Sequence, residues 1–211
     1  MPRMSAPPKT ILTATPEEER AIREAVRTAD PGTLGPGRCL ATHAHTAGVL
    51  DLFADPAVSD PIYALPRPFT AHSIAEWIEH CAQARANGDG LLFLTLAPDG
   101  QVMGYSKISV WPERSSAELG GALRATLQNS GSGGAGAAHT IGWIFDTLHV
   151  RLICLTAVLD NIRSLKLIDR MGFKRMGERD AVRADGTIRR SQYWELTREE
   201  WRALLINSAR Q

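Results

Sequence analysis

The chain has 211 residues, 44% of them hydrophobic and 22% charged, and its formal net charge is +1. This length and composition predict one globular domain with its own hydrophobic core. The balanced charge gives no basic face for nucleic acid, and no apolar run approaches the roughly 20 residues that span a membrane. The amino-terminal sequence MPRMSAPPKT lacks the apolar segment of a secretory signal. No nucleic-acid or membrane partner is therefore expected.

The cysteines and histidines form no pattern typical of a disulfide or metal protein. Cys39, Cys81 and Cys154 are odd in number and contain no CxxC pair. This favours free thiols in a reducing cytoplasm. His43 and His45 lie close together in the sequence, but no clear carboxylate or cysteine partner joins them. No metal is expected.

Residues 1–37 are interpreted as an extension of the main domain, which we place at residues 38–211. The extension begins with a proline-rich segment, and Thr15 followed by Glu18 predicts a helix start with a capping box. The helix is expected to end near Ala29, where Pro and Gly follow. Its thin apolar stripe is expected to dock on the main body or on a partner chain, so a homodimer is one of the expected assemblies.

The order of the predicted elements is typical of an α+β fold. In chain order they are a strand (38–45), a helix (46–53), a long loop, a helix capped by Thr70, a hairpin (90–97 and 101–110), a strand from Ala117, a glycine-rich run, a helix (139–150), a strand (151–160), a helix (162–171), two strands (174–184 and 189–196) and a terminal helix opened by a capping box at Thr197. The antiparallel meander and the strand–loop–helix–strand crossover predict one mixed sheet flanked by helices.

The glycine-rich run, QNSGSGGAGAA at residues 128–138, is the main candidate for ligand binding. Its glycines leave the backbone free to adopt positive φ and to approach a ligand without a Cβ in the way. Between a strand and a helix start, such a loop turns several N–H groups toward one point, where the helix dipole favours an anion. The alternative is a flexible linker. The elements that follow favour a phosphate cradle.

Several motifs occur in a characteristic order over residues 38–205. They are DLFADPAVSD with RPFTAHSIAEWI, the hairpin DGQVMGYSKIS, the strand AELGGAL, the glycine-rich run, the crossover FDTLHVRLICLTAVLDNIRSLKLIDRMGFKRMGE and the closing DGTIRRSQYWELTREEW. In this order they resemble the GCN5-related N-acetyltransferase (GNAT) superfamily, and within it the ribosomal-protein N-acetyltransferase branch. The resemblance implies the GNAT fold, in which the fourth and fifth strands splay apart, and acetyl-CoA as co-substrate.

The resemblance implies where acetyl-CoA binds. The glycine-rich run corresponds to the pyrophosphate loop of the family, in either of two registers that differ in the side chain beside the diphosphate. The backbone just before the loop is expected to pair with the pantetheine arm. Helix capping is a second role for Asn161 in the N-x-x-S motif. The implied cofactor-binding residues are Leu123, Arg124, Gln128, Asn129, Gly131, Ser132, Gly133, Gly134, Asn161 and Ser164.

The resemblance also implies the catalytic residues. Glu118 lies on the fourth strand, where this branch often has a glutamate that activates the amine. The alternative is an ordinary solvated or ion-paired strand residue. Ile168 replaces the tyrosine acid of many family members, so Ser164, Tyr193 or water is left to protonate the thiolate. A backbone N–H between Ala122 and Arg124 is the expected oxyanion donor.

Substrate recognition is expected from loop 60–69, which carries Tyr63, and from hairpin 179–190 with the neighbouring Tyr193. The hairpin mixes arginines with acidic residues, so a strongly cationic substrate is not indicated. The expected activity is direct acetyl transfer, in a ternary complex, to the primary amine of a peptide N-terminus or a small molecule. The alternative is a noncatalytic module that binds coenzyme A or a partner.

Overall fold

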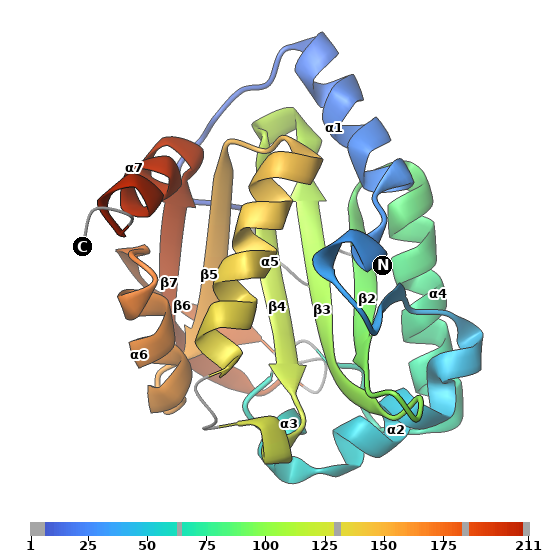
Figure 1. Ribbon diagram of the computed structural model, residues 1–211. Coiled ribbons are helices and arrows are strands. Elements are labelled where there is room, and N and C mark those ends of the chain that lie inside the picture. The colour runs from blue at the N-terminus through green and yellow to red at the C-terminus, as the bar shows by residue number, and fades with distance from the viewer. Residues whose placement is uncertain (1–6, 63–64, 129–131, 183–185, 209–211) are drawn as a thin grey trace.

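The computed structural model describes residues 7–62, 65–128, 132–182 and 186–208 (Figure 1). Its centre is one mixed sheet of seven strands in the order β1-β2-β3-β4-β5-β7-β6. Only β4 and β5 pair in parallel, and every other neighbouring pair is antiparallel. This confirms the predicted α+β class. The strands are β1 (Arg38–Leu40), β2 (Gly90–Leu96), β3 (Val102–Trp111), β4 (Ser116–Leu123), β5 (Leu152–Val158), β6 (Lys174–Val182) and β7 (Ile188–Thr197).

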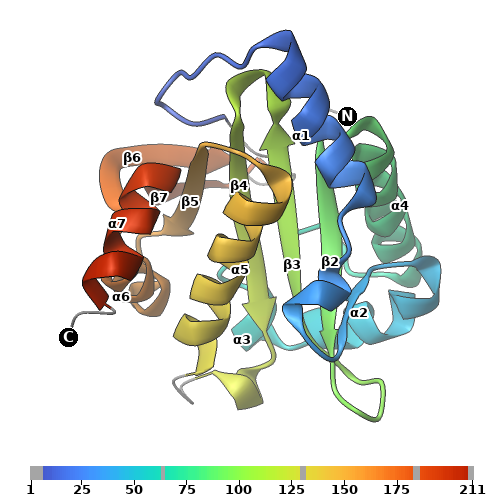
Figure 2. The same ribbon diagram turned by 45° about the horizontal axis from the view of Figure 1, so that its top comes forward.

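Helices cover both faces of the sheet (Figures 1 and 2). They are α1 (Pro16–Thr28), α2 (Thr46–Ala54), α3 (Pro56–Ser59), α4 (Ala71–Asn87), α5 (Ser132–Leu148), α6 (Ile162–Arg170) and α7 (Arg198–Ser208). Side chains of α1, α5, α6 and α7 belong to the core on one face, and those of α2 and α4 to the core on the other. No helix within the described residues is long and apolar enough to cross a membrane.

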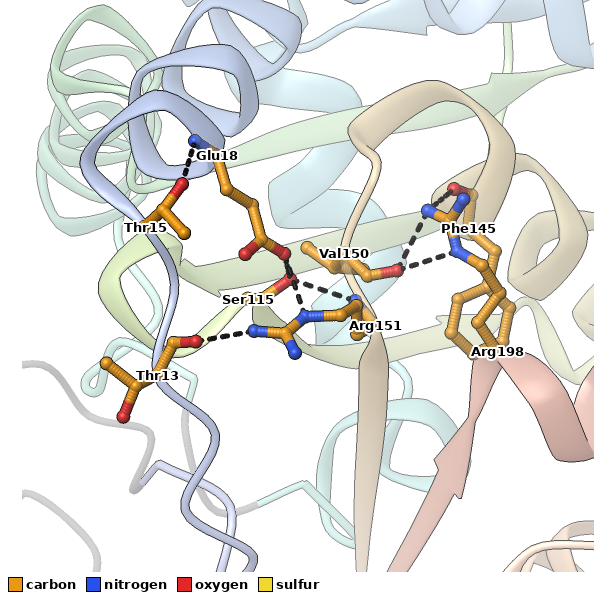
Figure 3. Close-up of polar contacts among 8 residues, drawn as sticks. All are labelled: Thr13, Thr15, Glu18, Ser115, Phe145, Val150, Arg151 and Arg198. Carbon is orange, nitrogen blue, oxygen red and sulfur yellow. Dashed lines mark hydrogen bonds and ion pairs between the residues drawn. The ribbon is translucent and has the colours of Figure 1, made fainter.

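The apolar stripe of α1 docks on the main body. Ile22 and Val26 are fully buried in the same core as the side chains of α5. Thr15 caps the helix as predicted, because its Oγ1 accepts the Glu18 N–H at 3.2 Å. The Glu18 carboxylate does not complete a capping box, since it accepts instead from Ser115 Oγ at 2.6 Å and Arg151 Nε at 2.8 Å (Figure 3). The boundary at residue 37 stays a prediction.

Two element boundaries differ from the sequence-based expectation. Strand β1 ends at Leu40 rather than near His45, because the chain turns into a 3-10 helix where His45 Nδ1 accepts the Thr42 N–H at 3.1 Å. Helix α5 begins at Ser132 rather than near His139, so most of the glycine-rich run is its first two turns.

The helix starts at Thr70 and Thr197 agree with the prediction. Thr70 Oγ1 accepts the Ser73 N–H, and Ser73 Oγ accepts the Thr70 N–H in return. Thr197 and Glu200 make the same reciprocal pair at the start of α7. Such pairs satisfy N–H groups that a helix start leaves open.

The predicted splay between the fourth and fifth strands is confirmed. Pairing between β4 and β5 runs only from Ser116 with Leu152 to Glu118 with Cys154. Beyond this point β4 stays paired with β3 as far as Leu123, and β5 stays paired with β7 as far as Val158. The facing edges of β4 and β5 therefore open into a gap that begins beside Glu118.

Candidate active site

The β4 edge presents two backbone positions to this gap. Arg124 N donates to Met103 O at 2.7 Å, across the pair of antiparallel strands β3 and β4. Hydrogen-bonded and non-hydrogen-bonded pairs alternate along such a ladder. The N–H and C=O groups of Ala122 therefore also face β3, whereas those of Gly121 and Leu123 face the gap. Of the backbone donors expected between Ala122 and Arg124, this geometry selects Leu123.

Arg124 is engaged away from the gap by its side chain as well. Its guanidinium donates to Val102 O at 3.0 and 3.1 Å and to Asp51 Oδ2 at 2.7 Å. The side chain is mostly buried, at 16% exposure. Arg124 thus ties the end of β4 to α2 and β3, and Leu123 is the residue of this predicted pair that faces the gap.

Glu118 is the last residue of β4 that pairs with β5, and it is only 7% exposed. Its Oε1 accepts from Thr156 Oγ1 at 2.9 Å. Arg179 Nη2 lies 3.7 Å from the same oxygen and donates to Thr156 Oγ1 at 2.9 Å. No hydrogen bond to Glu118 Oε2 comes from another described residue. One carboxylate oxygen is therefore fixed by β5 and β6, and the other is left for a ligand or water.

Room for a ligand exists on the same face of β4. A Cβ built on Gly120 would meet no heavy atom within 4 Å outside its immediate chain neighbours. Side chains alternate along a strand, so Gly120 and Glu118 share one face of the sheet. The buried carboxylate thus borders an open patch of backbone.

Tyr193 forms the floor beneath Arg179. It is fully buried, and the Arg179 guanidinium lies 4.3 Å from its ring centroid. The Tyr193 hydroxyl has no hydrogen-bond partner among the described residues. Burial raises the pKa of Tyr193, and the neighbouring Cys154 thiol, a weak hydrogen-bonding group, raises it further. Burial and the Glu118 charge likewise raise the pKa of Cys154. Contact of Tyr193 with substrate stays a prediction.

The glycine-rich run meets α6 next to the gap. A Cβ on Gly134 would lie 3.3 Å from Leu167 Cδ1 of α6. The Gln128 side chain joins β4 to α6, because its Nε2 donates to Leu123 O at 2.7 Å and its Oε1 accepts from Arg163. Ser132 and Gly133 belong to the first turn of α5. Asn129 and Gly131, on which the two loop registers differ, lie outside the described residues.

The N-x-x-S motif starts α6. Asn161 Oδ1 accepts the Ser164 N–H at 3.1 Å, so the capping role of Asn161 is present. The Ser164 hydroxyl is half-buried in the first turn and makes no hydrogen bond to another described residue. These residues therefore lie at the end of β5, next to the glycine-rich start of α5.

A cleft of about 480 Å³ lies at this end of the sheet. Arg189 of β7 spans it, donating to Asp60 O at 3.4 Å and pairing with the Asp160 carboxylate. The loop from residue 60 and the last hairpin, which the sequence predicts to select the substrate, thus meet here. Tyr63 of that loop lies outside the described residues. The lining residues are Asp60, Pro61, Asp160, Asn161, Ile162, Arg163 and Arg189.

The roles of three polar residues of the site were not predicted from the sequence, although Arg179 belongs to the hairpin expected to recognise the substrate. Thr156 and Arg179 hold Glu118, and Arg163 contacts Gln128. Arg163 could have been noticed as a cation inside the N-x-x-S motif, beside an expected diphosphate site. Thr156 and Arg179 carry no motif, because their roles arise only when β5 and β6 are placed near β4.

Within the described residues, no group of three or more His, Cys, Asp and Glu side chains could hold a metal ion. Cys39, Cys81 and Cys154 are free thiols. The polar groups of the site are therefore backbone amides, one carboxylate with its arginine and threonine, and the start of α5.

An open strand edge, a glycine-rich helix start and a buried carboxylate where β4 and β5 separate offer backbone groups to an extended, anionic ligand. The sequence comparison assigns the family, since residues 39–174 match the model described as "Acetyltransferase (GNAT) domain". The match covers more than half of the chain, which therefore belongs to the GNAT family and is an acetyltransferase. Members of this family use acetyl-CoA. No curated protein sequence matches the chain.

Solved structures share the fold at low sequence identity. A ribosomal-protein-S5-alanine acetyltransferase from Vibrio fischeri matches with a TM-score of 0.66 and 15% identity, covering 78% of this chain and 93% of that one. RimJ from Mycobacterium smegmatis, in complex with CoA-disulfide, gives 0.65 and 17%, covering 77% and 82%. A GNAT-family acetyltransferase from Bacillus anthracis gives 0.62 and 16%, covering 77% and 95%.

Proposed function

We propose that this acetyltransferase transfers the acetyl group of acetyl-CoA to a primary amine by direct attack in a ternary complex. The observation that carries the proposal is the position of Glu118. This residue is nearly buried where β4 and β5 separate, and its Oε1 is hydrogen-bonded to Thr156. The amine belongs to a peptide N-terminus or a small molecule. The free cysteines favour a reducing cytoplasm as the place of the reaction.

The residues around the gap fit acetyl-CoA. The β4 edge offers the N–H and C=O groups of Gly121 to the amides of the pantetheine arm, together with the Leu123 N–H, since the Leu123 carbonyl already accepts from Gln128. The first turn of α5, including Ser132, Gly133 and Gly134, offers N–H groups to the diphosphate. Gln128 and Arg163 border the same place, and Arg163 adds a positive charge. When bound, acetyl-CoA supplies an acyl group activated as a thioester.

Three groups of this chain then serve the transfer. Glu118 Oε2 accepts a proton from the ammonium form of the amine, directly or through water, while Oε1 stays bound to Thr156. The Leu123 N–H, which faces the gap, is the proposed donor to the negative charge that develops on the carbonyl oxygen. The Ser164 hydroxyl, which has no partner among the described residues, passes its proton to the leaving sulfur and takes up the second proton that the attacking nitrogen loses, so that it ends as a hydroxyl again.

The cleft beneath Arg189 is proposed to select the amine. It combines the guanidinium of Arg189 with Asp60 and Asp160 and with the exposed side chain of Ile162. A mixed lining of this kind favours a partly apolar substrate of low charge over a polycation such as a polyamine. A short peptide N-terminus meets this description.

The test of the proposal is the Glu118→Gln variant. Turnover should fall by about 10²–10⁴-fold, the typical contribution of a positioned acid–base group, because the amide cannot accept the proton. Affinity for acetyl-CoA, measured by calorimetry, should stay close to wild type. Glu178→Gln is the matched control, since that glutamate is 40% exposed on β6 and pairs with Arg190. Thiol release over a panel of free and N-terminally blocked peptides, small amines and polyamines gives the rates.

Two outcomes would contradict the proposal. Wild-type turnover of Glu118→Gln would leave that carboxylate a structural ion pair. Tight binding of acetyl-CoA without thiol release from any amine of the panel would instead favour a noncatalytic coenzyme A-binding module.

A further inference from the structure

We propose that Arg179 is a positioning residue for the transfer, acting on Glu118 through Thr156 and held in place by the Tyr193 ring. The inference rests on the proposed role of Glu118. It assigns a function to a residue that carries no recognisable motif and lies on β6, two strands away from β5, with β7 between them.

Arg179 contacts a hydroxyl, a carboxylate and an aromatic ring. Its Nη2 donates to Thr156 Oγ1 at 2.9 Å and lies 3.7 Å from Glu118 Oε1. Its guanidinium carbon lies 4.3 Å from the centroid of the Tyr193 ring. The side chain is only 19% exposed, so these contacts are made largely out of water. A guanidinium held by a ring and a hydroxyl has little conformational freedom, so it can hold the Glu118 carboxylate in one position.

The strand register explains why these side chains meet. Thr156 lies opposite Tyr193, and Arg179 lies opposite Ser191, two residues from Tyr193 on β7. Residues two apart on a strand point to the same face. Thr156, Tyr193 and Arg179 therefore share the face that carries Glu118, and the long arginine side chain crosses the Tyr193 ring to reach it.

The chemistry of Glu118 requires such a partner. A nearly buried carboxylate is costly unless it is paired and hydrogen-bonded. Thr156 alone supplies one neutral donor to Oε1, and Arg179 adds the charge that balances the carboxylate. Thr156 can point its hydroxyl at Glu118 because its own oxygen accepts from Arg179. The result is a chain of donors that leaves Oε2 as the oxygen able to receive a proton.

The competing explanation is an ion pair that only stabilises the sheet. It predicts that loss of Arg179 lowers the unfolding temperature and does not change the turnover of the folded enzyme. The positioning role predicts instead a loss of turnover that depends on the presence of Glu118. The two differ in a kinetic measurement on folded protein.

The experiment compares Arg179→Met and Thr156→Val with Arg175→Met as matched control. Arg175 lies on the same strand β6 but outside hairpin 179–190, is 55% exposed and pairs with Asp169. For Arg179→Met we expect kcat to fall about 10–100-fold, with KM for acetyl-CoA within about twofold of wild type, because misplacing a reacting group lowers turnover. Added guanidinium ion should restore part of the rate to Arg179→Met and none to Thr156→Val.

The double variant Glu118→Gln/Arg179→Met completes a cycle. If Arg179 acts through Glu118, its removal costs nothing further once the carboxylate is gone, so the double variant has the rate of Glu118→Gln. A further 10-fold loss in the double variant, or a wild-type rate in Arg179→Met, overturns the positioning role. If Arg179→Met does not fold, Thr156→Val decides, and a wild-type rate there overturns it equally.

The outcomes also separate this inference from the proposed function. A wild-type rate in Glu118→Gln removes the base, and the inference falls with it. A slow Glu118→Gln with a fast Arg179→Met overturns only the positioning role of Arg179.

Discussion

At the scale of single residues, the ring and the hydroxyl of Tyr193 are expected to contribute differently. The ring supports Arg179, whereas the buried hydroxyl has no hydrogen-bond partner among the described residues. A buried polar group without a partner destabilises a fold by about 1–3 kcal/mol. The raised pKa of Tyr193 makes the hydroxyl a reluctant proton donor.

Tyr193→Phe is therefore expected to keep turnover near wild type and to leave the free energy of unfolding unchanged or higher by up to about 1 kcal/mol. Tyr193→Leu removes the ring under Arg179 and should lose turnover as Arg179→Met does. Thiol release and chemical unfolding measure the two quantities. A large drop in turnover for the phenylalanine variant would make the hydroxyl the proton donor that the sequence leaves open.

Residues of the site differ in how far the sequence predicts them. Glu118 was predicted because the strand motif AELGGAL resembles the family, and the structure places it where the two strands separate. Thr156 was not predicted, since it binds a carboxylate 38 residues away in the sequence. Polar contacts between strands depend on register and twist, which the periodicity of one strand does not contain.

At the scale of elements, the glycine-rich run is the clearest difference between sequence and structure. Glycine has a helix propensity about 1 kcal/mol per residue below that of alanine, so a loop up to residue 138 was expected. The structure extends α5 back to Ser132. Packing overrides propensity here, because α5 buries Ile141, Ile144 and Phe145 and meets Leu167 of α6 at Gly134. Capping boxes are more local: the one predicted at Thr197 and Glu200 is formed, whereas the one predicted at Thr15 and Glu18 is not completed, because Ser115 and Arg151 bind the Glu18 carboxylate.

Two glycines of α5 should respond differently to alanine. A Cβ on Gly136 would meet nothing within 4 Å, whereas one on Gly134 would lie 3.3 Å from Leu167 Cδ1. Gly136→Ala should stabilise the fold by about 0.5–1 kcal/mol. Gly134→Ala should gain less or lose, because the end of the Leu167 side chain must move. Thermal unfolding of the two variants gives the order, and a more stable Gly134→Ala would contradict the packing of α5 on α6.

At the scale of the whole molecule, the amino-terminal segment links parts of the chain that lie far apart in sequence. Thr10 donates its N–H and hydroxyl to the buried carboxylate of Glu195, and Lys9 Nζ donates to Met176 O at 2.6 Å. Arg151, the residue just before β5, donates to Thr13 O and to the Glu18 carboxylate (Figure 3). The segment thus runs from the strands beside the active site to α1 on the opposite face.

These contacts predict the behaviour of a chain that starts at Arg38, the boundary expected from sequence. This shortened chain lacks α1 and so loses Ile22 and Val26, which are both fully buried. Burial of each of these side chains stabilises the fold by about 1.5–3 kcal/mol. Glu195 also loses its Thr10 donors. Because a domain is stable by only about 5–15 kcal/mol, the shortened chain should unfold at much lower denaturant concentration or fail to fold.

The matched control is a chain that starts at Pro7, which keeps every contact described for the segment and should unfold like the full chain. Ile22→Ala in the full chain refines the comparison, with an expected loss of about 2–5 kcal/mol. If the chain from Arg38 unfolds at the same denaturant concentration as the control, residues 38–211 fold independently and the extension is an addition to a complete domain. The structure argues for the opposite result, because α1 and α5 share one core.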